Sequence, residues 1–185
     1  MTLVDLSLKV NTEMYKAAQN NSGAPYGHIG THFDVMNKEF PLEYFSRKGY
    51  VFDVRSVRDR DIDLCDVDLS KVHQNMFIGF DTGWLEEYAY GTLAYYHDHP
   101  QLSYALIDAL LERSISIIGI DCAGIRRGKE HTPADQQCAD HGTFVVENMI
   151  HLSEIAGQDG WVIHTAPMNF SGMTGLVCRV IAEKE

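Results

Sequence analysis

The chain has 185 residues, 45% of them hydrophobic and 22% charged, which is ordinary for one globular domain, so we expect a single domain over residues 1–185. Its 15 lysines and arginines against 26 aspartates and glutamates give a formal net charge of −11. That charge repels phosphate backbones and argues against a nucleic-acid partner. The sequence lacks a run of roughly 20 apolar residues, so we also expect no membrane span.

The first half of the chain predicts short strands. Residues 4–10 (VDLSLKV) alternate apolar and polar side chains, which is typical of a half-buried strand and not of a signal peptide. Residues 50–57 (YVFDVRSV) are rich in β-branched and aromatic side chains, and residues 76–80 (MFIGF) form a short apolar run before the turn signal DTG. We predict a strand at each of these places.

The second half predicts two helices and four strands. Residues 103–114 (SYALIDALLERS) have helical spacing with Ser103 as a cap, and residues 132–142 have Thr132 to cap a helix and Gly142 to close it. Apolar runs that predict strands occupy residues 115–121, 143–149, 161–167 and 174–183. With about three helices in all, the order predicts an α/β fold with a mixed, β-rich sheet.

Four cysteines, Cys65, Cys122, Cys138 and Cys178, are widely scattered and form no C-x-x-C pair. This pattern predicts reduced, mostly buried thiols in a cytoplasmic protein, and it argues against a disulfide framework or a zinc knuckle.

The segment HIGTHFD (residues 28–34) concentrates three good metal ligands, His28, His32 and Asp34. On a straight strand His28 and His32 would be separated by about 13 Å, at roughly 3.3 Å per residue, too far for all three side chains to reach one ion. A shared ion therefore requires the backbone to bend at Gly30, which glycine permits. The alternative is a strand that happens to carry histidines.

This segment resembles the H-x-G-T-H-x-D signature of the metal-dependent cyclase family, which includes bacterial kynurenine formamidase and isatin hydrolase. Further segments are similar to family motifs in the same order: DTGW (81–84), HPQLS (99–103), ISIIGID (115–121) and FVVENM (144–149). The resemblance implies a β/β/α arrangement in a homodimer or homotetramer. It also implies hydrolysis of an amide or lactam bond of a small molecule with one or two divalent ions, zinc or manganese.

The same resemblance assigns the ligands. It implies that His28, His32 and Asp34 bind metal and that Asp34 can bridge two ions. For a second ion it implies Glu147 and a histidine twelve residues earlier, where this chain has Asp135 instead. Two flanking histidines, His131 and His141, can substitute for it.

The chain departs from the family where the motif usually continues D-x-P-x-H, because Lys38 stands in place of the histidine assigned to proton transfer. Lys38 can be a base if burial or a nearby cation depresses its pKa, can hold a substrate carboxylate or oxyanion, or can be a solvated surface lysine. Protonation of the leaving group then falls to Lys38, His131 or His141. Arg126 and Arg127 can bind a substrate carboxylate or can be a solvated pair in a loop. Trp84 can line the pocket or belong to the apolar core.

Two rival functions remain open at this point. One is a metal-containing protein that binds small molecules without turnover. The other is a dehydratase or isomerase that uses the metal to stabilise an enolate, with Lys38 as the base. No glycine-rich nucleotide-binding pattern is present, so we expect no cofactor besides the metal.

Overall fold

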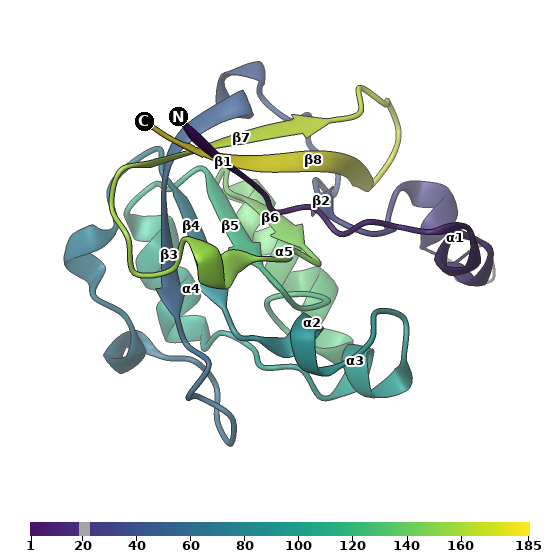
Figure 1. Cartoon of the computed structure of the whole chain (residues 1–185), viewed down its shortest axis with the longest axis horizontal. Helices are drawn as coiled ribbons and strands as arrows, with labels where there is room; N and C mark the ends of the chain where they lie inside the picture. Colours follow the sequence, from purple (N-terminus) through teal and green to yellow (C-terminus); the bar gives the residue numbers. More distant parts are fainter. Residues whose placement is uncertain (19–22) are drawn as a thin grey trace.

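A closed β-sheet organises the chain in the computed structural model, which describes residues 1–18 and 23–185 (Figure 1). Seven strands pair in the order β8-β2-β6-β5-β4-β3-β7, and β7 pairs with β8 again to complete a barrel, while β1 adds to β8. The strands of the described part are β1 (Thr2–Asp5), β2 (His32–Asp34), β3 (Ser46–Asp53), β4 (Phe77–Asp81), β5 (Ile117–Ile120), β6 (Phe144–Glu147), β7 (Trp161–Pro167) and β8 (Gly175–Lys184).

Strand direction divides the barrel into two parts. β3, β4, β5 and β6 run parallel to one another, whereas β2, β7 and β8 form antiparallel pairs. The two ends of the chain meet in the antiparallel part, because β1 pairs with the end of β8. The mixed, β-rich single domain expected from the sequence is therefore confirmed.

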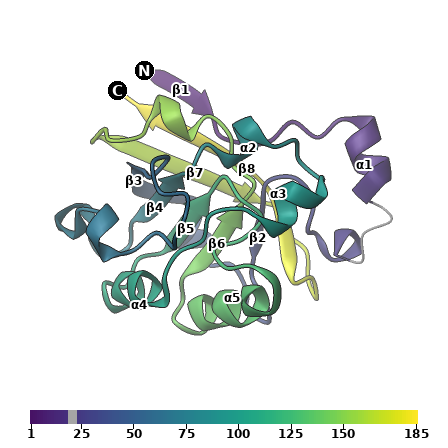
Figure 2. The same cartoon turned by 90° about the horizontal axis from the view of Figure 1, so that it is seen from below.

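Alternation along the strands creates two apolar cores. On β6, Phe144 and Val146 belong to the cluster inside the barrel, whereas Val145 belongs to the cluster outside it. The outer cluster is covered by α4 (Tyr104–Glu112) and α5 (His131–Asp140), which lie side by side against the parallel strands (Figure 2). The face of the sheet beneath α5 is the one that carries the site.

Three more α-helices and six short 3-10 helices complete the described part, more helices than the three expected. The α-helices are α1 (Thr12–Ala18), α2 (Trp84–Glu87) and α3 (Leu93–His97). The 3-10 helices are η1 (Ala24–Tyr26), η2 (Leu42–Phe45), η3 (Leu64–Asp66), η4 (Leu69–Lys71), η5 (Gly128–Glu130) and η6 (Leu152–Glu154).

Two predicted boundaries are wrong for identifiable reasons. β1 ends at Asp5 because the Ser7 hydroxyl replaces the backbone pairing with β8, donating to the carbonyl of Val180 at 3.1 Å and accepting from its amide at 2.7 Å. α5 begins at His131 directly after η5, with Glu130 as its N-cap residue, so Thr132 is already inside the helix and does not cap it.

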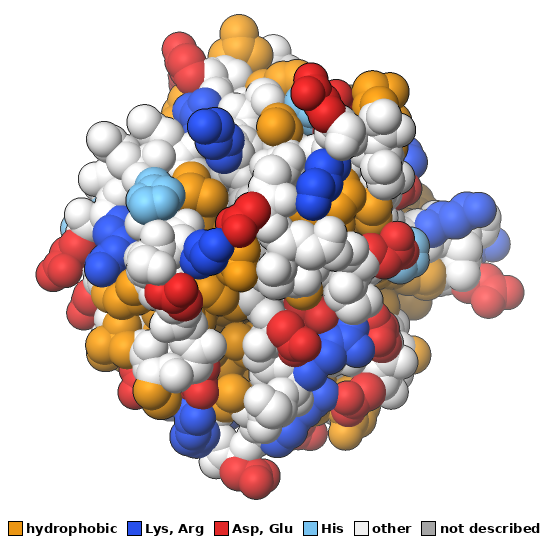
Figure 3. Space-filling view, turned by 60° about the vertical axis from the view of Figure 1, so that its left-hand side comes forward, with side chains coloured by type: hydrophobic (Ala, Val, Ile, Leu, Met, Phe, Trp, Pro, Cys, Tyr) orange, Lys and Arg blue, Asp and Glu red, His pale blue; other side chains and the backbone are white. Residues whose placement is uncertain are grey.

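The surface carries both signs of charge. Figure 3 shows acidic and basic side chains interspersed over one face, without a continuous basic patch there. Among the described residues, no helix has the length and apolar character needed to cross a membrane.

Candidate metal centre

His32, Asp34 and Glu147 face the same way because β2 and β6 are paired. In that antiparallel pair His32 lies opposite Glu147 and Asp34 lies opposite Val145. Since their neighbours Phe33 and Val146 point into the barrel, alternation turns these three side chains outward, toward α5. α5 contributes His131 and Asp135, which are four residues apart and therefore on one helix face.

The bend required at Gly30 is present. Gly30 has a φ of 60°, and His28 Nδ1 lies 3.1 Å from His32 Nε2 and 2.9 Å from Asp34 Oδ1. Thr31 holds the bend, because its hydroxyl accepts from the amide of Leu8 at 2.7 Å and donates to the carbonyl of Asn148 at 2.8 Å. The backbone thus brings His28 alongside His32 and Asp34 of β2.

We expect Gly30→Ala to damage both folding and the site. A Cβ atom at Gly30 would lie 2.5 Å from Val10 Cγ2, and the φ of +60° is unfavourable for alanine. We expect thermal denaturation to show a decrease of about 1–3 kcal/mol in the free energy of unfolding. Elemental analysis is expected to show less bound metal. Gly157→Ala is the control, because its φ is +71° but no atom lies within 4 Å of the added Cβ. Equal effects of the two variants would contradict the steric argument.

The ligand-type side chains form two groups that share Asp34. The first is His28, His32 and Asp34, and the second is Asp34, His131, Asp135 and Glu147, and within each group the ligand atoms all lie within 4.8 Å of one another. In the second group His131 Nε2 lies 3.2 Å from Asp135 Oδ2 and 3.5 Å from Glu147 Oε1. Glu147 Oε2 in turn lies 3.7 Å from His32 Nε2, which links the two groups.

Hydrogen bonds to one ring nitrogen of His28 and of His32 determine which nitrogen of each ring faces the centre. His32 Nδ1 donates to the carbonyl of Gly30 at 2.8 Å, which leaves Nε2 with its lone pair toward Asp34 and Glu147. His28 Nε2 pairs with the Thr174 hydroxyl at 2.8 Å, which leaves Nδ1 inward. Such outer partners fix the tautomer and the orientation of a metal-bound imidazole.

The electrostatics of the centre also fit a cation. Burial raises the pKa of Asp34, but the hydrogen bond from His28 and the nearby histidine charges outweigh it and hold that pKa at about 2. Burial, and then the charge of Asp34, raise the pKa values of Asp135 and Glu147 well above normal. Four carboxylate oxygens of these residues are buried without a hydrogen-bond partner: Asp34 Oδ2, both oxygens of Asp135, and Glu147 Oε1. A divalent ion would satisfy these oxygens and favour the charged forms.

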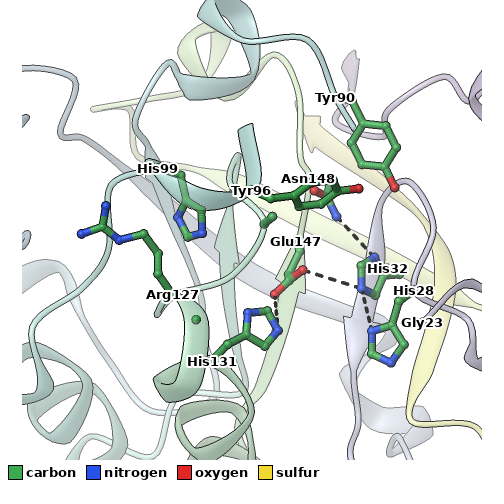
Figure 4. Close-up of a pocket in the computed structure, with 12 residues that line it drawn as sticks. Gly23, His28, His32, Tyr90, Tyr96, His99, Arg127, His131, Glu147 and Asn148 are labelled. Atoms are coloured by element: carbon green, nitrogen blue, oxygen red, sulfur yellow. Dashed lines mark hydrogen bonds and ion pairs between the residues drawn. The ribbon is translucent and has the colours of Figure 1, made fainter. Parts of the chain in front are cut away.

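A pocket of about 230 Å³ opens onto this centre. Figure 4 shows His28 and His32 on one side of it, His131 and Glu147 in the middle, and His99 and Arg127 on the other side. The volume suits a small molecule.

Sequence reasoning missed the residues that hold the backbone of Gly30. Tyr90 accepts a hydrogen bond from the Gly30 amide at 2.9 Å, and Asn148 donates to the Gly30 carbonyl at 2.9 Å. Asn148 is itself held by the hydroxyl of Tyr95. The adjacency of Asn148 to Glu147 offered a signal for it, whereas Tyr90 lies in a stretch with no motif.

Lys38 and His141 lie outside the pocket. Lys38 Nζ forms an ion pair with Asp140 at 2.7 Å, and both side chains are substantially exposed. His141 is the residue after α5 and its Nδ1 pairs with the carbonyl of Gln137. At 3.6 residues per turn, His141 projects from a different side of the helix than His131 and Asp135. The structure thus separates the two residues predicted to be catalytic from the other candidates.

Arg126 and Trp84 likewise have structural partners. The Arg126 guanidinium is buried and bonds to Asp61, to Glu130 and to the carbonyl of Leu102. Trp84 is buried, and its Nε1 donates to the carbonyl of Tyr95 at 3.1 Å. These contacts take up the groups that were expected to face a substrate, and the neighbouring Arg127 lines the pocket instead.

We expect Lys38→Ala to leave metal content and catalytic rate within about twofold of wild type, because an exposed ion pair stabilises a protein by only roughly 0–1 kcal/mol. Parallel measurements of initial rate and melting temperature on this variant check the point. A loss of rate of a hundredfold or more with an unchanged melting temperature would restore Lys38 as a catalytic residue.

Fold and site together define a class: a closed β-rich barrel with a buried histidine and carboxylate centre suited to one or two divalent ions. The chain belongs to the Cyclase family, whose model, described as "Putative cyclase", matches residues 4–126.

Solved structures share this fold at low sequence identity. One is described as a potential metal-dependent hydrolase with cyclase activity (20% identity, TM-score 0.76, 98% of this chain and 96% of that one). Another is a predicted metal-dependent hydrolase from Bacillus stearothermophilus (18%, 0.72, 98% and 97%), and a third is isatin hydrolase A from Ralstonia solanacearum (16%, 0.76, 100% and 92%). No curated protein matches the chain.

Proposed function

We propose that the protein is a metal-dependent hydrolase that cleaves an amide, lactam or related carbonyl bond of a small molecule with one or two divalent ions, zinc or manganese. The observation that carries the proposal is the pair of ligand groups sharing Asp34, with buried, unpartnered carboxylate oxygens beside a small pocket. The similarity to structures described as a metal-dependent hydrolase and as isatin hydrolase supports it.

The first group would hold one ion through His28 Nδ1, His32 Nε2 and Asp34. When bound, such an ion lowers the pKa of its water to about 7 and polarises a carbonyl, so the protein needs no serine or cysteine nucleophile. Gly30, Thr174 and Asn148 keep the two imidazoles oriented for that task.

The second group has a different role depending on the number of ions. With two ions, His131, Asp135 and Glu147 are ligands and Asp34 is shared. With one ion, Glu147 Oε1 can hold a proton. His131, whose side chain is 30% exposed and whose Nε2 lies 3.5 Å from that oxygen, can then pass a proton to the leaving group. We favour the two-ion arrangement, because three carboxyl groups with so few donors around them require more positive charge than one ion brings.

A hydrolysis screen tests the proposal. Protein loaded with zinc or manganese is incubated with N-formyl aromatic amines, lactams, lactones and esters in ¹⁸O-labelled water, and the products are analysed by mass spectrometry. Hydrolysis with incorporation of one labelled oxygen is expected, and it should disappear after chelation. Proton exchange into a substrate without cleavage would point to the isomerase alternative.

One observation favours the binding-protein alternative. Lys38 occupies the position of the family's proton-transfer histidine and is held by Asp140 outside the pocket. A protein of this kind would retain metal and bind ligands, yet hydrolyse nothing in the screen.

We further propose a cytoplasmic homodimer or homotetramer. Leu42, Phe45, Met168 and Phe170 are each 46–85% exposed and line one surface hollow, a concentration of apolar area that favours contact between copies. Light scattering on the purified protein measures the oligomeric state directly.

A further inference from the structure

Arg127 lies at the edge of the pocket and has no acidic partner among the residues that the structure describes. Its backbone amide and its Nε both donate to Gln101 Oε1, at 3.1 and 3.3 Å, but its two terminal nitrogens bond to no residue that the structure describes. The contrast with Arg126 is direct, because that guanidinium is saturated by Asp61, Glu130 and Leu102.

Arg127 lies across the pocket from His28 and His32. Figure 4 shows it beside His99 on the side opposite His28 and His32, with its guanidinium extending away from them. A ligand that spans the pocket therefore meets the acidic centre at one end and a free guanidinium at the other. A guanidinium with two free terminal nitrogens matches a carboxylate well.

His99 supplies a second, uncharged contact. Its side chain is fully buried, Nδ1 donates to the carbonyl of Pro100 at 2.8 Å, and Nε2 has no hydrogen-bond partner among the described residues. Burial lowers its pKa to about 4, so the ring is neutral at pH 7 and Nε2 presents a lone pair. A buried acceptor of this kind is costly unless a ligand donates to it.

We propose that Arg127 and His99 form a recognition subsite for a carboxylate-bearing substrate, with Arg127 holding the carboxylate and His99 accepting a hydrogen bond from a neighbouring hydroxyl or N–H group. The inference rests on the proposed function only in placing the bond to be cleaved at the opposite, metal-binding end. A single guanidinium in a pocket that is lined by Glu147, a residue grouped with Asp34 and Asp135, favours a monoanion over a phosphate dianion.

Binding of three small probes tests the subsite without requiring turnover. Isothermal titration calorimetry compares benzoate, benzamide and 3-hydroxybenzoate on wild type, Arg127→Gln and Arg179→Gln. The last variant is the matched control, because Arg179 is an exposed arginine paired only with Asp5 on the surface. Each titration is run on zinc-loaded protein and again after chelation and dialysis, since benzoate can also bind a metal ion.

We expect benzoate to bind wild type more tightly than benzamide does, and Arg127→Gln to weaken benzoate about tenfold to a hundredfold. Benzamide affinity should change less than twofold, Arg179→Gln should behave as wild type, and the difference should persist after chelation. The proposal is overturned if benzoate shows no advantage over benzamide, if Arg127→Gln binds benzoate as wild type does, or if chelation alone abolishes benzoate binding.

A second variant tests His99. We expect 3-hydroxybenzoate to bind wild type about threefold to tenfold more tightly than benzoate, and His99→Phe, which keeps a ring in the buried space, to remove that preference while retaining benzoate binding. Equal preference in wild type and His99→Phe would exclude His99 from the subsite.

Failure of this inference is distinguishable from failure of the proposed function. If the protein hydrolyses amides and Arg127→Gln leaves its affinity for benzoate unchanged, it is a hydrolase without this subsite. A protein that discriminates the probes through Arg127 but hydrolyses nothing is a carboxylate-binding protein.

Discussion

Asp34→Asn is expected to lose bound metal from both ligand groups and to reduce any hydrolytic rate by at least about a hundredfold. Asp34 is the residue common to the two groups, and its Oδ1 lies 2.9 Å from His28 Nδ1. Asparagine keeps the size of the side chain but removes the negative charge that a shared ligand supplies, and loss even of outer-shell partners costs roughly 10–100-fold in metal affinity or activity. Elemental analysis and initial rates measure the two effects.

Asp140→Asn is the matched control for this prediction. It also removes one carboxylate, but from an exposed side chain paired with Lys38 and not from the metal centre. We expect it to retain metal and rate within about twofold. Normal metal content in Asp34→Asn would contradict the assignment of Asp34 as a shared ligand.

The second large effect concerns the stability of the chelated protein. Asp135 and Glu147 have raised pKa values because they are buried and lie near Asp34. Above about pH 4, the ordinary pKa of carboxyl groups, these residues lose their protons in the unfolded chain but keep them in the folded chain. These two residues therefore lower the free energy of unfolding as pH rises above about 4, by up to about 1.4 kcal/mol per pH unit for each proton.

Asp34 acts in the opposite sense. Its folded pKa of about 2 lies below the ordinary value of 3.8, so the stability it contributes is present above about pH 4 and is lost as pH falls toward 2. The combined contribution of these three carboxyl groups to the stability of the chelated protein is therefore largest near pH 4.

Denaturant unfolding of chelated protein between pH 5 and 8 measures this slope. We expect Asp135→Asn to be more stable than wild type at pH 8 by roughly 1–3 kcal/mol, while it binds less metal. Asp140→Asn should follow wild type. Destabilisation by Asp135→Asn in the chelated protein would show that Asp135 has a structural role in place of a ligand role.

Local patterns predicted the parts of the fold and site that depend on neighbours in sequence. Apolar runs predicted β4, β5, β7 and β8 with small boundary errors. The bend at Gly30 followed from geometry alone, because His28, His32 and Asp34 can meet only if the backbone turns there, and the structure has that turn.

Contacts between segments far apart in the chain could not be predicted from local sequence patterns. Thr174 orients His28 across 146 positions, and Tyr90 reaches Gly30 across 60. Asp61, 65 positions away in the sequence, binds the guanidinium of Arg126. This contact decides that Arg127, and not Arg126, is available to a ligand. Each of these outcomes depends on which segments the fold brings together, and not on neighbours in sequence.

The most direct test of the account is the metal content of protein purified without chelator, measured by elemental analysis on wild type beside Asp34→Asn and Asp140→Asn. The two ligand groups predict about two zinc or manganese ions per chain in wild type and Asp140→Asn, and a marked loss in Asp34→Asn. Wild type that contains no divalent metal, and takes up none when zinc or manganese is supplied, would contradict the central claim.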